Sequence, residues 1–384
     1  MEQILVLAAL LALCCLLLHA EGLTSRESGG GSGVFLLLLG AFAVRYYLLD
    51  RCPCAGEDAV RDAISYFRDA GGLWGLRSFH GAFSVPVQYC LAFCSYARTG
   101  SLYIFKYLCF FGDIVLAWGC QRCVAAVSLR ETPRRWAFFL VLFFPALLLL
   151  SCAGTGDGLR WIFPVLAVSA ALQGKFRLIG AMLGLAIAAD PGMIWLLPVF
   201  WVFPALRQNT GRSIPWLLGT FFLALLPALL LGRPTALTLP FWPRIDPPAG
   251  RIELARIPFF TLSPVAGIGI WAGLTALTIY RLCGRDAIHD RRRQLAGLEL
   301  AALAAGGLLP DGAGFLTGGA VLALTLCCLG RGMIPAALCA AFAASLSVFS
   351  TVFPKLLPIP LWWGSAALLA GIVILLGYVL FKRS

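Results

Sequence analysis

Charged side chains are scarce in this sequence. Asp, Glu, Lys and Arg together make up 12% of its 384 residues, whereas 60% are hydrophobic and the mean hydropathy is +0.88. Soluble domains carry about 25% charged residues, and their cores do not absorb so many apolar side chains. The apolar residues also come in runs near the ~20 residues that a helix needs to cross hydrocarbon. These observations exclude a soluble enzyme, a fibrous protein and a disordered linker, and they predict an integral, multi-pass membrane protein.

Acidic residues are scarcer than basic ones. The 18 Asp and Glu stand against 30 Lys and Arg, which gives a formal net charge of +12. In a membrane protein such a surplus usually marks cytoplasmic loops that face anionic lipid head groups. We therefore interpret the basic charge as a signal of orientation, and we expect membrane lipids, not nucleic acid, as partners.

Motifs typical of several enzyme classes are missing. The sequence has no zinc-ligand spacing, no glycine-rich phosphate loop after a strand and no Ser/His/Asp order typical of a triad. These absences disfavour the use of nucleotide sugars and leave no metal ligands to assign; the sequence leaves open whether a divalent cation takes part. Most of the 14 cysteines lie inside apolar runs, and neither Cys52 with Cys54 nor Cys120 with Cys123 has a second ligand pair nearby. We expect them to be packing residues.

The apolar runs predict an all-α polytopic bundle of about 11–13 transmembrane helices, with further helices in extracytoplasmic loops. Residues 1–33 combine a signal-like first apolar segment with a Gly-rich linker, and residues 34–384 form one transmembrane domain. The sequence leaves open whether segment 4–18 is cleaved. The runs lie at about 4–18, 34–49, 82–98, 103–128, 136–152, 159–173, 176–204, 213–232, 259–280, 294–309, 314–330, 332–353 and 358–380.

Loop charge predicts the orientation of the bundle. Lys and Arg recur at every second turn, which marks those turns as cytoplasmic. The remaining turns are then extracytoplasmic, and they include a large region at 50–102 and a second long loop at 233–258. Segment 82–98 is short and contains Pro86, so we interpret it as interfacial or re-entrant; the alternative places 50–80 inside the cell, with 82–98 crossing. In a bacterium this protein would lie in the plasma membrane.

Residues 57–70 form the most informative polar stretch. At 100° per residue, Asp58, Asp62 and Asp69 share one face of a helix. The opposite face is apolar and consists of Val60, Ala63, Ile64 and Phe67. This pattern predicts an amphipathic helix on the membrane, whose carboxylates suit a general base or a metal ligand acting on a lipid-linked substrate. The alternative is the solvated face of an interfacial helix.

The second outer loop is rich in arginine, against the positive-inside trend. Arginine pairs bidentately with phosphate oxygens, and Trp242 is suited to stacking on a sugar or to an interfacial position. We therefore predict that Arg233, Arg244, Arg251 and Arg256 bind a phospholipid or polyprenyl-phosphate head group. Simple interfacial anchoring is the alternative.

Isolated polar residues at the other outer turns complete the candidate site. They are Lys355, His80, Asp157, Asp190 and Asp311. Asp190 interrupts the apolar run 176–204 in the sequence Asp190-Pro191-Gly192, which predicts the tip of a hairpin because a carboxylate is costly in lipid. Asp113 lies inside an apolar run, which makes it a functional candidate because of its cost in lipid; the structural explanation is a pairing with Lys106, seven residues earlier on the same helix face.

The order of these features resembles a family of polytopic glycosyltransferases with the GT-C fold. The similarity is greatest to the bacterial integral membrane mannosyltransferase-like proteins and to the catalytic subunit of GPI mannosyltransferase I. It spans about residues 34–330 and is carried by Asp62-Ala-Ile-Ser-Tyr66-Phe67, Gly81 to Tyr89 with Pro86, Lys106 to Asp113, Phe144-Pro145 to Asp157, Gly174-Lys175 to Pro198, and Leu308 to Gly312. Several polar positions of the family motifs differ, among them Gly154 to Gly158 and Asp311 to Gly314.

The resemblance implies a shared fold and a reaction. It implies inverting transfer of a mannose-like hexose from a polyprenyl-phosphate donor to a glycan or glycolipid acceptor at the outer face. Asp62 or Asp58 would act as general base, and the arginines of 233–258 or Lys355 would stabilise the leaving phosphate. Two alternatives stay open, namely a catalytically inactive GT-C scaffold and a transporter or flippase of a lipid-linked glycan.

Overall fold

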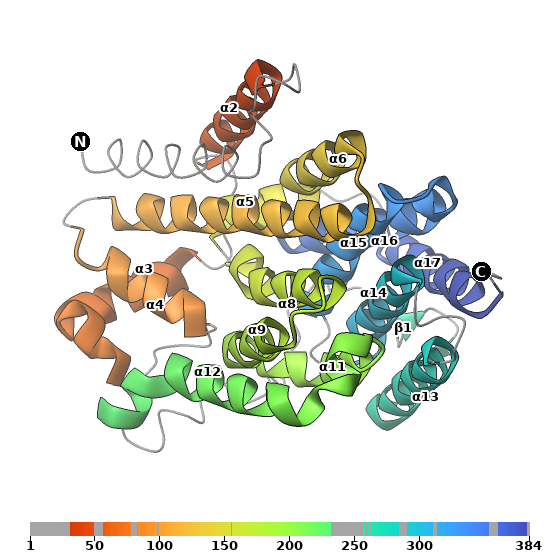
Figure 1. Cartoon of the computed structure of the whole chain (residues 1–384). Coiled ribbons are helices and arrows are strands. Elements are labelled where there is room, and N and C mark those ends of the chain that lie inside the picture. Colours follow the sequence, from red (N-terminus) through yellow and green to blue (C-terminus); the bar gives the residue numbers. More distant parts are fainter. Residues whose placement is uncertain are drawn as a thin grey trace.

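The computed structural model describes residues 31–49, 57–77, 83, 85–97, 100–154, 156–231, 256–257, 260–261, 263–283, 290–309, 313–352 and 360–381. Within these ranges the chain is almost entirely helical, which confirms the predicted helical architecture (Figure 1). Its helices are α2 (Gly31–Leu49), α3 (Glu57–Asp69), η2 (Gly72–Arg77), α4 (Val85–Cys94), α5 (Ser101–Val127), α6 (Glu131–Leu142), α7 (Pro145–Ala153), α8 (Asp157–Leu172), α9 (Phe176–Ala189), η3 (Pro191–Leu196), α10 (Leu197–Phe200), α11 (Pro204–Gln208), α12 (Thr210–Leu231), α13 (Pro264–Leu282), α14 (Arg291–Leu308), α15 (Ala313–Cys327), η5 (Arg331–Met333), α16 (Ile334–Val352) and α17 (Trp362–Phe381).

A small hairpin departs from the all-α prediction. Strand β1 (Arg256–Ile257) pairs antiparallel with β2 (Phe260–Thr261). Two residues per strand are too few to form a sheet that organises the fold. The hairpin therefore leaves the helical architecture unchanged.

Only some of the described helices are long and apolar enough to cross a membrane by themselves. These are α5, residues Val265–Leu282 of α13, and α17; the pair α6 and α7, bent by 44°, is a fourth if it forms one broken span. Seven shorter apolar helices of 10–17 residues accompany them, at Phe35–Leu49, Gly158–Leu172, Phe176–Ala189, Pro191–Phe200, Thr210–Leu226, Gly314–Cys327 and Ile334–Ser350. These spans fit a membrane protein. The predicted number of about 11–13 crossings requires most of the short helices to cross as well, and it stays a prediction.

Helix α5 is the longest helix of the bundle, and its glycines set how closely α8 packs against it. A Cβ added at Gly112 would lie 2.7 Å from the Leu159 side chain, and one at Gly119 would lie 3.0 Å from Val165. Small residues at an interface let two helix backbones approach. The same device joins α9 to α12, since a Cβ at Gly180 or Gly184 would collide with backbone carbonyls of α12.

The largest apolar core surrounds α14. Every residue of this helix from Arg293 to Leu308 is buried, and α13, α15 and α17 pack around it. In Figure 1 these helices form the C-terminal half of the molecule, while α5, α8, α9 and α12 form the other half. Helix α15 also contacts α5, α6 and α8, which joins the two halves.

Helices α3 and α4 form a second, smaller core at the N-terminal end of α5. The amphipathic helix predicted for 57–70 is confirmed as α3. Its apolar residues Val60, Ala63, Ile64 and Phe67 are buried against protein, with Leu76, Leu91 and Phe105 in the same cluster. The expectation that this face lies on the membrane is therefore wrong, because α4, η2 and α5 already cover it.

The predicted segment boundaries agree with the structure in several places. Helix α4 has 10 residues, so it is only ~15 Å long, whereas crossing the hydrocarbon core takes about 30 Å. This length favours an interfacial or re-entrant segment over a crossing one. The predicted interruption at Asp190 is confirmed, because α9 ends at Ala189 and η3 begins at Pro191. Helix α2 begins at Gly31, so the end of the expected Gly-rich linker is helical.

Candidate functional site

The two carboxylates predicted as catalytic, Asp58 and Asp62, and the further candidate Asp69 lie on the exposed face of α3. Asp58, Asp62 and Asp69 are all exposed, while the opposite face of the helix is buried. The buried face fixes the helix, so the three carboxylates point away from the bundle and are available to water or to a substrate. Arg68 anchors the C-terminal end of α3, because its guanidinium donates hydrogen bonds to the carbonyl oxygens of Ser95 (3.4 Å) and Ala97 (3.1 Å).

Several helix ends meet at the end of the bundle that holds α3 and α4. Helix α8 begins next to α4, since a Cβ added at Gly156 would lie 2.5 Å from Val87. The same end of the bundle holds the start of α15, because the indole of Trp161 in α8 donates to the carbonyl oxygen of Gly314 (2.8 Å). Asp190 lies there too, because a Cβ added at Gly314 would lie 3.9 Å from its Oδ2, and its Oδ1 caps η3 by accepting a 2.9 Å hydrogen bond from the Gly192 N–H. The start of α8, the turn at Asp190 and the start of α15 therefore belong to one end of the molecule.

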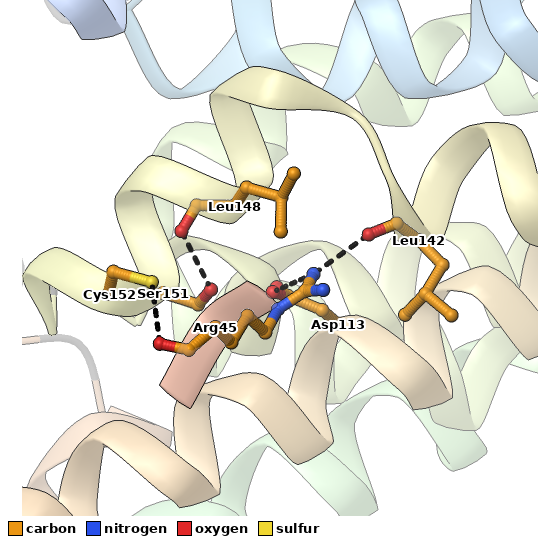
Figure 2. Close-up of polar contacts among 6 residues, drawn as sticks. All are labelled: Arg45, Asp113, Leu142, Leu148, Ser151 and Cys152. Carbon is orange, nitrogen blue, oxygen red and sulfur yellow. Dashed lines mark hydrogen bonds and ion pairs between the residues drawn. The ribbon is translucent and has the colours of Figure 1, made fainter. Parts of the chain in front are cut away.

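A buried ion pair joins α2 to α5. Nη2 of Arg45 lies 3.1 Å from Oδ2 of Asp113, and the two side chains are 3% and 1% exposed. The same nitrogen donates to the carbonyl oxygen of Leu142 at the end of α6 (2.9 Å), so both acceptors converge on one end of the guanidinium (Figure 2). The guanidinium carbon also lies 4.2 Å from the centre of the Phe110 ring, in cation–π range. The pair thus ties α2, α5 and α6 together.

The carboxylate of Asp113 also lies against the first turn of α8. Gly158 is the second residue of that helix, and a Cβ added there would collide with Oδ1 of Asp113. The N-terminus of a helix favours a nearby negative charge through its free N–H groups and its dipole. Asp113 is therefore held as an anion by a guanidinium on one side and by a helix N-terminus on the other.

A second cation, Lys106, is buried two turns earlier on α5. It is 3% exposed, and Nζ donates to the carbonyl oxygen of Leu49 at the end of α2 (3.1 Å). The expected pairing of Lys106 with Asp113 is therefore wrong. The spacing placed both on one helix face, but Arg45 from a different helix lies closer to the carboxylate.

A cavity of about 380 Å³ lies between α2, α5 and α7 and reaches both cations. Its lining is otherwise mostly apolar or aromatic, with contributions from Leu39, Phe42, Tyr46, Tyr107 and Phe110. On α7 its wall is formed by Ser151, whose hydroxyl donates to the Leu148 carbonyl oxygen, and by Cys152, whose thiol contacts the Arg45 carbonyl oxygen (Figure 2). The cavity thus combines an apolar wall with two buried positive charges.

Sequence reasoning did not single out Arg45 and Glu299. Glu299 is 1% exposed within the core around α14, and neither of its carboxylate oxygens has a hydrogen-bond partner among the described residues. The signal was present in both cases, because a lone charge inside an apolar run is costly in lipid and needs a partner or a role. For Arg45 the structure supplies the partner.

The structure places the remaining predicted residues only in part. Asp157 is the first residue of α8, and Arg256 lies in β1. The other predicted residues lie outside the described residues: Arg233, Arg244, Arg251, Trp242, His80, Asp311 and Lys355. Within the described ranges, no group of three or more His, Cys, Asp or Glu side chains is arranged to hold a metal ion. Cys120 and Cys123 are buried packing residues of the main core, as expected from their apolar surroundings.

Comparisons with known proteins add no family. No family model matches the sequence, and no curated protein or solved structure gives a significant match to it.

Proposed function

We propose that this chain is a divergent membrane glycosyltransferase of GT-C type. It would transfer a mannose-like hexose from a polyprenyl-phosphate donor to a glycan or glycolipid acceptor on the extracytoplasmic side. The observation that carries the proposal is the placement of Asp58 and Asp62. Their exposed carboxylates are held on a fixed helix, at the end of the bundle where the α8 and α15 N-termini and Asp190 also lie.

The chemistry follows from a carboxylate beside a lipid-linked sugar. Asp62 accepts the proton of an acceptor hydroxyl while that oxygen forms a bond to the anomeric carbon. The bond from the anomeric carbon to the donor phosphate breaks, and polyprenyl phosphate leaves with the bonding electrons. Arginine guanidiniums stabilise such a leaving phosphate well, and the proposal assigns this role to Arg233, Arg244, Arg251, Arg256 or Lys355.

Exposed leucine and aromatic side chains beside α3 support an interfacial position for this helix. Leu73 and Trp74 on η2, Phe93 on α4 and Tyr96 are exposed, and Trp and Tyr are enriched at the membrane–water interface. With these side chains among the lipid head groups, α3 would lie at the level of a lipid-linked phosphate. The apolar contact with lipid is then made by η2 and α4, while α3 presents its carboxylates.

The decisive experiment measures sugar transfer by single carboxamide variants. Membranes containing the full chain are incubated with radiolabelled polyprenyl-phosphate mannose, and label in the acceptor fraction is counted. We expect Asp62→Asn or Asp58→Asn to lower the rate by at least ~100-fold, as for loss of a general base. Asp69→Asn is the matched control, because it removes an equally exposed carboxylate about 10 Å further along the same helix.

Two outcomes would overturn the proposal. Full transfer by both Asp62→Asn and Asp58→Asn would eliminate carboxylate catalysis on α3. The second concerns the side of the membrane on which α3 lies. Asp58→Cys, in a background lacking Cys52 and Cys54, should react with an impermeant maleimide in intact cells. Labelling only after permeabilisation would place α3 on the wrong side for the predicted 233–258 loop.

Glu299 favours one alternative function, a transporter of a lipid-linked glycan. Transporters use intramembrane carboxylates to bind coupling ions or protons, and Glu299 is buried without a hydrogen-bond partner in the part of the chain that the structure describes. Under this alternative, Glu299→Gln would abolish glycolipid translocation in proteoliposomes, and Asp62→Asn would not.

A further inference from the structure

The cavity between α2, α5 and α7 has the chemistry of a binding site. Arg45 and Lys106 both line it, and both are almost fully buried. Among the described residues, Nε and Nη1 of Arg45 have no hydrogen-bond partner, although the guanidinium carries five N–H donors. Buried donors without acceptors are costly, so such a cavity is suited to a ligand that supplies the acceptors.

The charge balance of this cavity selects the sign of the ligand. Asp113 neutralises Arg45 through the 3.1 Å ion pair. Among the described residues, the partner of the Lys106 ammonium is a neutral carbonyl oxygen, that of Leu49, and no ion pair is formed. Among these residues, Lys106 therefore adds one positive charge that no carboxylate balances, on a side chain that is only 3% exposed, and an uncompensated buried charge is costly. An oxyanion next to Lys106 would compensate it.

The rest of the wall selects the other part of the ligand. Apart from its two cations, Ser151 and Cys152, the lining is apolar or aromatic, and the cavity reaches the exposed side chains of Leu39 and Tyr46 on α2. The outer face of α2 continues in Leu36, one turn before Leu39, which is exposed too. A molecule in this cavity thus finds cations at its inner end and an apolar helix surface at its mouth.

We infer that this cavity binds an anionic amphiphile, with its phosphate or carboxylate head group at Lys106 and Arg45 and its apolar chain leaving along α2. The ligand comes from the lipid phase, because the opening is apolar. The inference stands on this cavity alone and holds whether or not the chain transfers a sugar.

The test uses the purified full chain in a neutral detergent, with decyl phosphate as the probe. A ligand that binds only the folded state raises the unfolding temperature as its concentration exceeds Kd. Decyl phosphate should give a saturable rise, while decanol, which has the tail alone, and inorganic phosphate, which has the anion alone, should give at least roughly tenfold weaker effects. Equal effects of decyl phosphate and decanol would overturn the inference, as would saturation by inorganic phosphate at the same concentration.

Variants locate the binding. Ala43→Phe fills the cavity from α2 and should abolish the effect of decyl phosphate, whereas Val44→Phe, on the next residue but outside the lining, should leave it intact. Lys106→Met should weaken decyl phosphate binding by at least roughly tenfold and decanol binding by less than about twofold. If Lys106→Met fails to fold, the comparison of Ala43→Phe with Val44→Phe still tests whether decyl phosphate binds in this cavity. Unchanged binding by Ala43→Phe, or no binding by the wild-type chain because its own residues fill the cavity, would refute the site.

Discussion

The ion pair between Arg45 and Asp113 allows a quantitative test of the fold. Arg45 makes three interactions that a neutral side chain would lose: the ion pair, the hydrogen bond to Leu142 and the contact with the Phe110 ring. Replacing Arg45 by Met keeps much of the side-chain volume but leaves the carboxylate of Asp113, which is 1% exposed, without its cation. Removal of one partner of a buried pair costs about 3–5 kcal/mol, so we expect Arg45→Met to lower the free energy of unfolding by ~4 kcal/mol.

Asp113→Asn should cost less. The amide keeps an oxygen that accepts a hydrogen bond from Arg45, and the guanidinium keeps its bond to Leu142 and its contact with Phe110. We expect a loss of about 2 kcal/mol, since hydrogen bonds to charged groups contribute about 1.5–3 kcal/mol. The double variant Arg45→Met with Asp113→Leu removes both charges and should recover to within ~1 kcal/mol of the wild-type chain, because an apolar pair often replaces a buried ion pair at no cost.

The assay is unfolding of the purified chain in mixed micelles by a denaturing detergent, followed by tryptophan fluorescence. The wild-type chain, Arg45→Met, Asp113→Leu and the double variant form a double-mutant cycle, which isolates the energy that couples the two sites; Asp113→Asn is measured beside it. Strict additivity of the two substitutions would refute the reasoning, since each side chain would then act without the other. Single losses below about 0.5 kcal/mol would do the same.

Three further substitutions test other parts of the structure by the same unfolding assay. Phe67→Ala removes a fully buried ring from the α3 face and should lower the free energy of unfolding by about 3–5 kcal/mol. The control is Ser65→Ala, at an exposed position of the same helix, which should change stability by less than about 0.5 kcal/mol. Equal effects would contradict the packing of α3 on protein. Gly318→Ala places a methyl group inside the Trp161 ring and should cost at least ~1–3 kcal/mol, whereas Gly273→Ala, with open space around its Cβ position, should be neutral or slightly stabilising. Glu299→Met replaces a buried carboxylate to which no described residue donates a hydrogen bond, and it should raise the free energy of unfolding by about 1–4 kcal/mol. A loss of stability would indicate that Glu299 has a compensating partner.

The sequence predicted the helices better than their partners. Composition and periodicity located the apolar helices, the amphipathic α3 and the break at Asp190, because each depends on residues close together in the chain. The amphipathic pattern of 57–70 also identified Phe67 and its neighbours as the apolar face of the helix, and this is the face that is buried. It did not tell lipid from protein as the burying surface, because a hydrophobic stripe satisfies both equally. That choice depends on α4 and η2, which reach α3 only through tertiary packing.

For a related reason, the spacing of residues in the sequence could not predict which buried charges pair with each other. Lys106 and Asp113 are seven residues apart, so helical geometry places them on one face, but two helical turns separate them along the axis by about 10 Å. Arg45 is 68 residues from Asp113 in the chain, yet lies 3.1 Å away in the structure. A lone Arg in an apolar run predicts that some partner exists; only the packing of α2 on α5 identifies it.

The arrangement of these charges explains why Lys106 and Asp113 have separate roles. Because Arg45 and the first turn of α8 satisfy the Asp113 carboxylate, that carboxylate is not needed to balance Lys106. Among the described residues Lys106 then has no carboxylate partner, and its Nζ donates instead to the carbonyl oxygen of Leu49, where α2 ends beside the cavity. The formal charges of Arg45, Lys106 and Asp113 sum to +1 whichever cation pairs with the carboxylate. Had Lys106 paired with Asp113, Arg45 would be the cation that no described carboxylate balances. The departure from the expected pairing therefore determines which cation is left for an anionic ligand, and here it is Lys106.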